Sequence, residues 1–367
     1  MKNQVPLVDL RKNYQSLKTK IDAAIQRVID KNDFILGNEV KKFESNFASF
    51  LNVKYCAGVS SGTAAIELAL KALNISHGDE VITTAHTWIS TVEAISNVGA
   101  IPVFADIDNK TFTIDPKEIR KKITKKTKAL LPVHLYGQPA RMKEIIKIAK
   151  EFKLKIIEDA AQAHGAKIFD KYCGTFGDIG CFSFYPGKNL GAFGDAGCVV
   201  SNNKLLINKI KKLRNHGSGK TKNNCDILGS NERLDGIQAS ILNVKLSYLE
   251  KWVSQRNKIA EIYDYHLNSI VKTPVKLDNI YHAYHLYVIQ TDNRRKVLHT
   301  LKRNSIDARV HYPLPVHKQN IYKEQYKKIK LSMTEDTCKK IISLPIFPEM
   351  TNKQVLRVCE VIKKVLK

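Results

Sequence analysis

Short apolar runs alternate with amphipathic segments through the first two thirds of the chain. The apolar runs are rich in β-branched residues and predict strands, whereas segments such as residues 141–152 have the apolar spacing of an amphipathic helix. Runs of about four to six apolar residues with helices between them are typical of parallel strands covered on both faces. The pattern therefore predicts an α/β fold with a largely parallel sheet. Strands are expected over residues 79–84, 101–106, 128–136, 153–159, 180–185 and 197–202.

The pattern changes after about residue 245. A long amphipathic stretch over residues 246–267 is followed by mixed strand patterns and a final helix over residues 352–366. We therefore expect a large domain of residues 1–245 and a smaller α+β domain of residues 246–367. The chain has no internal repeat, low-complexity segment or linker rich in proline and glycine, so the two domains should pack together.

Composition indicates a globular protein, because 367 residues that are 43% hydrophobic can form a substantial core. The net charge of +25 raises the alternative of a nucleic-acid-binding protein. However, the lysines are spread along helical faces such as residues 120–128 and 208–216, with no basic tail and no nucleic-acid-binding motif. We expect no nucleic-acid partner. The positive field would instead attract a small, acidic, phosphorylated substrate.

Cysteine usage and apolar runs indicate where the protein works. The seven cysteines are scattered and form no C-x-x-C pair, which predicts neither a disulfide framework nor a zinc or other metal site. The first ten residues lack the apolar stretch of a signal peptide, and no apolar run approaches the ~18 residues of a membrane span. A cytoplasmic protein without a membrane partner is expected.

Three short motifs carry possible chemistry, and the first is Ser61, Gly62 and Thr63 before a strong helix pattern. A glycine-containing turn at a helix N-terminus offers free backbone N–H groups to a phosphate, although the same residues also form an ordinary helix cap. The G-x-G-x-x-G motif of dinucleotide-binding folds is absent, which argues against a nicotinamide enzyme.

The second motif is Asp159, at the end of the apolar strand pattern over residues 153–159. Open α/β sheets bind ligands at the carboxyl ends of their strands, and a carboxylate there can hold a cationic ring nitrogen. The alternative is that Asp159 caps a helix formed by residues 160–165.

The third motif is Lys188 in the stretch SFYPGKNLGAFGDAG, residues 183–197. A tight and partly dry turn disfavours an ammonium ion, so this lysine could present a free amine for covalent and proton-transfer chemistry. On local sequence alone, a surface lysine beside a flexible glycine loop is the favoured interpretation.

The order of these motifs resembles that of a known family, the nucleotide-sugar aminotransferases of the DegT family. These are pyridoxal phosphate (PLP) enzymes of fold type I, with a mostly parallel mixed sheet between helices and a smaller C-terminal α+β domain. The resemblance covers nearly the whole chain. It rests on residues 34–44, 60–70, 78–95, 132–142, 156–166, 183–197, 229–242 and 310–317.

The resemblance implies a role for each residue that matches a family motif. Lys188 matches the lysine that binds PLP covalently and moves protons, and Asp159 matches the carboxylate that keeps the pyridine nitrogen protonated. Gln162 resembles the residue that contacts the phenolic oxygen of the ring. Trp88 corresponds to the residue that stacks on the ring, where many relatives carry phenylalanine.

A phosphate cup follows from the same resemblance. Ser61, the backbone amides of Gly62 and Thr63, and the hydroxyl of Ser183 match the family's cup for the PLP phosphate. Asn231 matches an asparagine that reaches the phosphate in the neighbouring subunit. The resemblance therefore implies a homodimer with shared active sites.

The implied reaction transfers an amino group from L-glutamate to a ketosugar, with pyridoxamine phosphate as the intermediate form of the cofactor. Residues 183–197 and 133–140 look like the branch that acts on dTDP-3-keto-6-deoxyhexoses, which implies a dTDP-3-amino-3,6-dideoxyhexose for a surface glycan such as lipopolysaccharide O-antigen. Tyr185, His311 and Tyr312 would then lie near the sugar or its pyrophosphate, unless Tyr185 only packs on a strand and the other two only form a turn.

Several alternatives remain at this point. The substrate could be a UDP-linked 3-keto sugar or a nucleotide-linked 4-keto-6-deoxy sugar, and the configuration at C4 is open. A non-catalytic regulatory protein with the same fold is a more remote alternative. Some relatives that are dehydratases carry histidine in place of the lysine, so Lys188 favours an aminotransferase.

Overall fold

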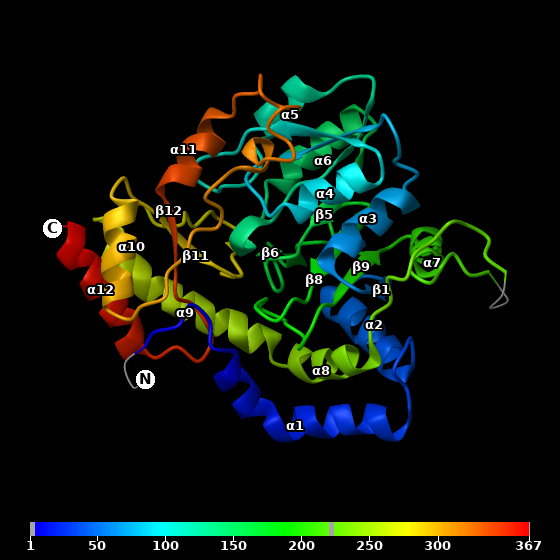
Figure 1. Cartoon of the computed structure of the whole chain (residues 1–367), viewed down its shortest axis with the longest axis horizontal. Helices are drawn as coiled ribbons and strands as arrows, with labels where there is room; N and C mark the ends of the chain where they lie inside the picture. The colour runs from blue at the N-terminus through cyan, green and yellow to red at the C-terminus, as the bar shows by residue number, and fades with distance from the viewer. Residues whose placement is uncertain (1–3, 220–223, 367) are drawn as a thin grey trace.

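The computed structural model describes residues 4–219 and 224–366 and is built around a seven-stranded mixed sheet (Figure 1). The strand order is β1-β9-β8-β5-β4-β2-β3, and β9 is antiparallel to both of its neighbours while the other six strands share one direction. The predicted, largely parallel sheet is confirmed. Its strands are β1 Tyr55–Val59, β2 Glu80–Thr84, β3 Ile101–Ala105, β4 Thr127–Leu130, β5 Lys155–Asp159, β8 Ile179–Ser183 and β9 Gly197–Ser201.

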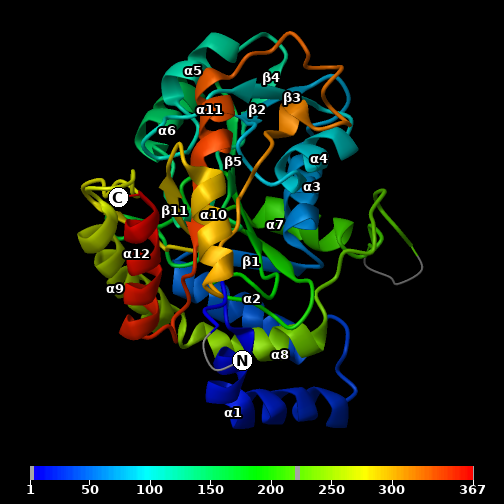
Figure 2. The same ribbon diagram turned by 60° about the vertical axis from the view of Figure 1, so that its left-hand side comes forward.

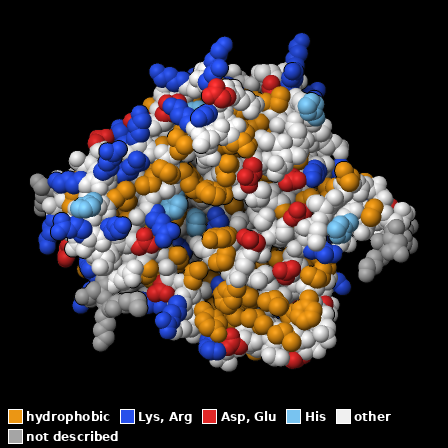
Figure 3. All heavy atoms as spheres, viewed as in Figure 1, with side chains coloured by type: hydrophobic (Ala, Val, Ile, Leu, Met, Phe, Trp, Pro, Cys, Tyr) orange, Lys and Arg blue, Asp and Glu red, His pale blue; other side chains and the backbone are white. Residues whose placement is uncertain are grey.

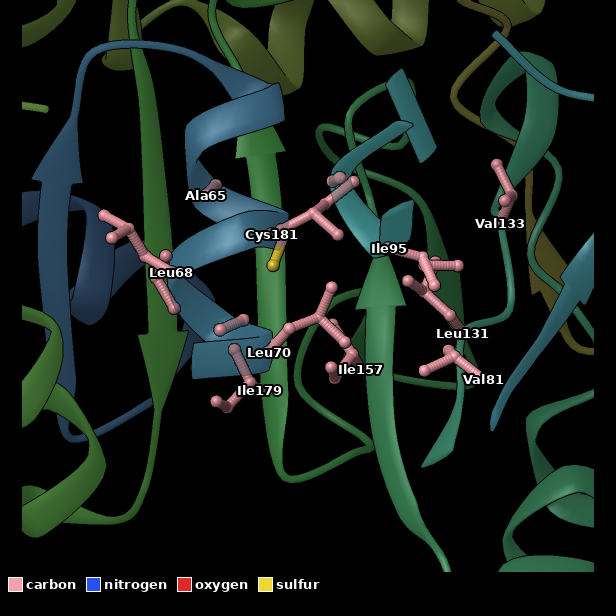
Figure 4. Packing of buried hydrophobic residues seen from close by; sticks show 14 of the residues in the cluster. Ala65, Leu68, Leu70, Val81, Ile95, Leu131, Val133, Ile157, Ile179 and Cys181 are labelled. Carbon is pink, nitrogen blue, oxygen red and sulfur yellow. The ribbon is translucent and has the colours of Figure 1, made fainter. Parts of the chain in front are cut away.

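Helices cover both faces of this sheet because its strands are apolar on both sides. These helices are α2 Asn38–Leu51, α3 Gly62–Ala72, α4 Ser90–Asn97, α5 Pro116–Lys122, α6 Met142–Glu151, α7 Lys204–Leu213 and α8 Gly236–Leu246. On one face, α3, α4 and α7 share a core with the strands, and Figure 4 shows Leu70 of α3 lying close to Ile157 and Ile179. On the other face, α2 and α8 pack beside β1, β8 and β9, and α5 and α6 pack beside β2, β4 and β5.

The remaining third of the chain forms a second core. It contains α9 Leu249–Leu267, α10 Arg294–Arg303, α12 Asn352–Leu366 and the antiparallel pair β11 Tyr287–Gln290 and β12 Ile341–Leu344. Val5 packs into this core, and α1 Leu10–Asp30 then lies against α8. Three short strands form a further small sheet: β6 Lys167–Ile168, β7 Lys171–Tyr172 and β10 Ile280–Tyr281.

One stretch of this last third returns to the large sheet. Residues 316–331, with the 3-10 turn η2 Val316–Lys318, pack on Val92 of α4 and Phe104 of β3 before α11 Ser332–Lys340 leads back to β12 (Figure 2). The two parts of the chain therefore contact each other extensively. The domain boundary between residues 245 and 246 stays a prediction.

Most predicted elements agree with the observed bounds, and two do not. The predicted strand over residues 128–136 ends at Leu130 as β4, and the chain then turns through the 3-10 turn η1 Leu135–Gly137. The predicted amphipathic stretch over residues 246–267 is α9, which begins at Leu249 instead of residue 246 and ends at Leu267 as predicted. Among the described helices, none is both long and apolar enough to cross a membrane.

Candidate active site

The site lies at one edge of the large sheet, where parallel strands end together. Because β1, β2, β4, β5 and β8 share one direction, the segments that follow them meet at the carboxyl edge. These segments contain nearly all of the predicted site residues: Ser61, Gly62 and Thr63 after β1, Trp88 after β2, Asp159 and Gln162 at and after β5, and Ser183, Tyr185 and Lys188 at and after β8.

Asp159 is the last residue of β5 and is only 5% exposed. Its Oδ2 accepts a hydrogen bond from the Thr91 hydroxyl at 2.8 Å, and its Oδ1 accepts one from the backbone N–H of Ala161 at 3.1 Å. Residues 160–166 form turns, so Asp159 does not cap a helix. Burial raises the pKa of its carboxyl, against the effect of these hydrogen bonds and of Lys188. No ion pair among the described residues includes Asp159, so its carboxylate is available to a cationic group.

Lys188 lies in a turn after β8, where its backbone N–H donates to the Tyr185 carbonyl at 2.8 Å. The side chain is half-buried, and burial lowers the pKa of its amine to about 8 although the charge of Asp159 acts in the opposite direction. Burial also lowers the pKa of the nearby His164 to about 3, and the charge of Lys188 contributes to this shift. The site therefore holds a lysine that loses its proton easily and a neutral imidazole.

The predicted phosphate cup is compact. Ser61 caps α3 by accepting a hydrogen bond from Ala64 N at 3.1 Å, so the cap interpretation holds, while the first N–H groups of the helix, those of Gly62 and Thr63, lie outside its hydrogen-bonding pattern. A Cβ at Gly62 would lie 2.6 Å from Cβ of Ser183. Only glycine allows Ser183 to approach the helix start this closely. The helix start that Ser61 caps is therefore also the predicted phosphate site, and the two interpretations do not exclude each other.

An aromatic pair stands on the other side of the site. Trp88 is 56% exposed, and its ring centre lies 5.5 Å from that of Tyr312. Gln162 donates from Nε2 to Tyr312 Oη at 3.1 Å and accepts from the backbone N–H of Tyr136 at 2.7 Å. The structure therefore brings Trp88, Gln162 and Tyr312 together. The Nδ1 atom of His311 lies 2.8 Å from Ser343 Oγ, and burial lowers the pKa of this imidazole to about 4.

The last two predicted residues, Tyr185 and Asn231, are both exposed. Tyr185 follows β8 and is 59% exposed, so it does not pack within the sheet. Asn231 is exposed in an extended segment that pairs with Asn215, and its neighbour Glu232 accepts a backbone hydrogen bond from Ser60 at 3.2 Å. Among the residues that the structure describes, no hydrogen bond links Asn231 to the cup of its own chain, and its role in a neighbouring subunit stays a prediction.

Three residues of the site were missed at the sequence level: Thr91, Tyr136 and Glu158. Glu158 is fully buried; it accepts backbone N–H groups of Gly174 and Gly177, and it pairs with His134 Nε2 at 2.9 Å. His134 Nδ1 accepts the N–H of Ala140, so Nε2 carries the proton and donates to Glu158. All of these residues lie inside the motifs that carry the family resemblance, and that position was the available signal.

The residues of this edge fit a PLP molecule. The unpaired, buried carboxylate of Asp159 suits a cationic ring nitrogen, and the open start of α3 beside Ser183 suits a phosphate. The amine of Lys188, which has a lowered pKa, lies near enough to Asp159 for the two charges to act on each other, and the exposed ring of Trp88 offers a stacking face. This fold and this set of residues define an aminotransferase of fold type I.

The chain belongs to the DegT/DnrJ/EryC1/StrS aminotransferase family, whose model matches residues 15–363. The predicted family and enzyme class are confirmed. The solved structure of DesV from S. venezuelae, in complex with a ketimine intermediate, is 39% identical, superposes with a TM-score of 0.96, and the match covers 98% of each chain.

Three curated relatives have similar sequences and different names. A "pleiotropic regulatory protein" of Geobacillus stearothermophilus is 43% identical, with 97% of each chain covered. The dTDP-3-amino-3,6-dideoxy-α-D-galactopyranose transaminase of Aneurinibacillus thermoaerophilus is 42% identical, with 98% of this chain and 99% of the relative covered. A UDP-N-acetyl-3-dehydro-α-D-glucosamine 3-aminotransferase of Acidithiobacillus ferrooxidans is 40% identical, with 99% and 98% covered.

Proposed function

We propose that the protein uses PLP to transfer the amino group of L-glutamate to the C3 keto group of a dTDP-linked 3-keto-6-deoxyhexose. The product is a dTDP-3-amino-3,6-dideoxyhexose for a surface glycan. The observation that carries the transfer chemistry is the pair of Asp159 and Lys188 at the carboxyl edge of the sheet. The choice of sugar is supported by the similarity to the dTDP-sugar transaminase of Aneurinibacillus thermoaerophilus.

Each of these two residues has a defined task in this proposal. When bound, PLP supplies an electron sink that stabilises negative charge on the amino-bearing carbon of the substrate. Asp159 favours the protonated ring nitrogen through a charge-assisted hydrogen bond. Lys188 accepts a proton from the α-carbon of L-glutamate, and its lowered pKa of about 8 keeps a useful fraction of the amine neutral near physiological pH.

The amino-sugar half-reaction distinguishes the candidate substrates. PLP-loaded protein is mixed separately with dTDP-3-amino-3,6-dideoxygalactose, with its gluco epimer, with a UDP-linked 3-amino sugar and with dTDP-4-amino-4,6-dideoxyglucose, while the visible absorption band of the bound cofactor is followed. We expect loss of the band with a dTDP-linked 3-amino sugar, and the faster epimer identifies the configuration at C4. Loss with the UDP-linked or the 4-amino sugar alone contradicts the assignment of the sugar.

A non-catalytic regulatory role is the alternative that the name of the Geobacillus relative suggests. The combination of Lys188, Asp159 and the stacking face of Trp88 supports the catalytic proposal instead. Addition of L-glutamate alone separates the two, because only an active aminotransferase converts its cofactor to the pyridoxamine form.

We also propose a homodimer in which Asn231 serves the neighbouring site. Figure 3 shows a broad hydrophobic area over the lower part of the molecule, where α1 and α8 lie in Figure 1. Leu10 of α1 is 44% exposed, and Phe34, Ile35 and Phe193 are exposed as well. Apolar groups gathered in this way favour burial against a second copy.

Mixed dimers test the shared site. Lys188→Ala and Asn231→Ala variants are each weak alone, but if Asn231 acts across the interface, a mixed dimer contains one site with both residues intact. Activity should therefore return when the two variants are unfolded and refolded together. No recovery, in a sample shown by sedimentation to contain dimers, would place Asn231 in its own subunit's site.

A further inference from the structure

The backbone of Tyr136 has an unusual conformation, and the residue contacts two predicted site residues, Gln162 and His311. It lies in η1 after β4, is only 2% exposed and has a φ of +61°. Non-glycine residues with positive φ are uncommon, and for a bulky side chain this conformation is maintained only when the surroundings impose it. The contacts of the Tyr136 side chain show what the conformation achieves.

Its hydroxyl forms part of a directed chain of hydrogen bonds. Tyr136 Oη donates to the carbonyl oxygen of His311 and lies 2.8 Å from His86 Nε2. Because a hydroxyl has one proton, His86 must donate from Nε2, and its Nδ1 then accepts from the thiol of Cys338, whose Sγ lies 3.4 Å away. The chain thereby ties residues 311, 136, 86 and 338, which come from four separate segments.

The backbone of Tyr136 forms a second connection, through Gln162, to the segment that contains His311 and Tyr312. Its N–H donates to Gln162 Oε1 at 2.7 Å, and Gln162 Nε2 donates to Tyr312 Oη at 3.1 Å. Residues 136, 162, 312 and 311 therefore form a closed ring of covalent and hydrogen bonds. Two consecutive residues, His311 and Tyr312, are thus both anchored to Tyr136, one directly and one through Gln162.

We propose that Tyr136 is the positioning residue that sets where the His311–Tyr312 segment meets the sugar substrate, and that L-glutamate does not depend on it. The inference rests on the proposed function, in which this segment contacts the sugar nucleotide. L-glutamate is small, and the two residues that its proposed half-reaction uses, Asp159 and Lys188, have no hydrogen bond to Tyr136 among the described residues. The sugar nucleotide is larger, and the family resemblance implies that it lies near His311 and Tyr312.

Tyr136→Phe tests this because it removes the hydroxyl and keeps the ring and the backbone N–H. We expect kcat/KM of the amino-sugar half-reaction to fall about 10- to 100-fold, because the half-buried carbonyl of His311 and the buried imidazole N–H of His86 both lose their partner. The L-glutamate half-reaction should stay within about twofold of wild type. Equal losses in the two half-reactions would overturn the inference.

Tyr326→Phe is the matched control. Tyr326 is also buried, and its hydroxyl donates to the Pro102 carbonyl at 2.7 Å, away from the segment. This variant loses a buried tyrosine hydroxyl of the same kind, so it should show a similar loss of thermal stability without any preference between half-reactions. A selective loss in the control as well would assign the effect of Tyr136→Phe to general destabilisation.

Hydrogen exchange gives a readout that needs no sugar. In protein loaded with cofactor but free of substrate, Tyr136→Phe should accelerate exchange at the amides of residues 310–312 and 314 about 10-fold, and exchange in β5 should not change. Unchanged exchange at these four amides overturns the inference whatever the substrate is. Accelerated exchange in a protein whose wild type converts no amino sugar would refute the proposed function and leave the positioning role intact.

A second variant covers the case that Tyr136→Phe does not fold. Ser343→Ala removes the bond to the His311 ring from β12 and leaves Tyr136 untouched. It should produce a smaller loss, about threefold to 10-fold, in the amino-sugar half-reaction only. If Ser343→Ala causes no loss that is specific to the amino-sugar half-reaction, the position of the His311–Tyr312 segment does not affect the sugar, and the proposal is contradicted.

Discussion

The two sides of the active site are built in different ways. At the carboxyl edge of the sheet, where we propose that PLP binds and which we call the cofactor edge, Ser61, Asp159 and Ser183 belong to strand ends or to a helix start, so regular backbone structure fixes their positions. On the opposite side, His311 and Tyr312 lie in an irregular segment that side-chain hydrogen bonds from Tyr136, Gln162 and Ser343 hold in place. In the proposed function, the chemistry shared by both half-reactions therefore rests on regular structure, whereas recognition of the sugar at the His311–Tyr312 side, which we call the recognition side, rests on a few side-chain hydrogen bonds.

Loss of Lys188 is the strongest test of the cofactor edge. In Lys188→Ala we expect both half-reactions to fall by at least about 10⁴-fold, because the covalent link and the proton carrier are lost together. Rapid-mixing spectroscopy with L-glutamate and with the amino sugar measures both. Appreciable turnover, or loss in one half-reaction only, would break the proposed division between the two sides.

Asp159→Asn should give the next largest effect. The amide keeps the shape of the carboxylate but removes the charge that favours a protonated ring nitrogen, so both half-reactions should slow by about 10²- to 10³-fold. PLP affinity, measured by quenching of tryptophan fluorescence, should fall in parallel. A loss confined to the amino-sugar half-reaction would show that Asp159 belongs to the recognition side instead.

The lowered pKa of Lys188 has a consequence for the stability of the cofactor-free protein. Because the folded-state pKa of about 8 lies below the unfolded value of 10.5, the unfolded chain binds more protons between these pH values, and stability rises with pH across this window. Below about pH 8 the buried charge destabilises the fold by up to about 3 kcal/mol. Lys188→Met should therefore be more stable than wild type near pH 7, and the difference should shrink by pH 10. Urea unfolding at both pH values measures this, and a constant difference would show that the amine is solvated.

Among the substitutions at Lys188, Asp159 and Thr91, Thr91→Val should have the smallest effect on activity. The hydroxyl of Thr91 donates to Asp159 and stabilises its charged form, so its removal should raise the pKa of Asp159 further and slow both half-reactions about 10-fold. Thr91→Ser restores the hydroxyl and should restore the rate. If serine does not rescue the rate, the effect of valine is one of packing and does not concern the carboxylate.

The sequence by itself predicted the positions of those site residues that lie at the end of a strand or at the start of a helix. Strand periodicity located the end of β5 at Asp159, and the helix signal after β1 located Ser61, Gly62 and Thr63. These predictions succeeded because a strand end and a helix start are short-range features, set by a few neighbouring residues. The order of the motifs then indicated the family.

Only the tertiary structure decided which distant side chains meet. The predicted strand over residues 128–136 is interrupted after Leu130, and the resulting turn brings Tyr136 to His86 and His311, each of which is 50 or more residues away in the sequence. Thr91 likewise reaches Asp159 across 68 residues. No local pattern encodes such pairs, because they depend on the register of the sheet and on the return of the C-terminal part of the chain to its carboxyl edge.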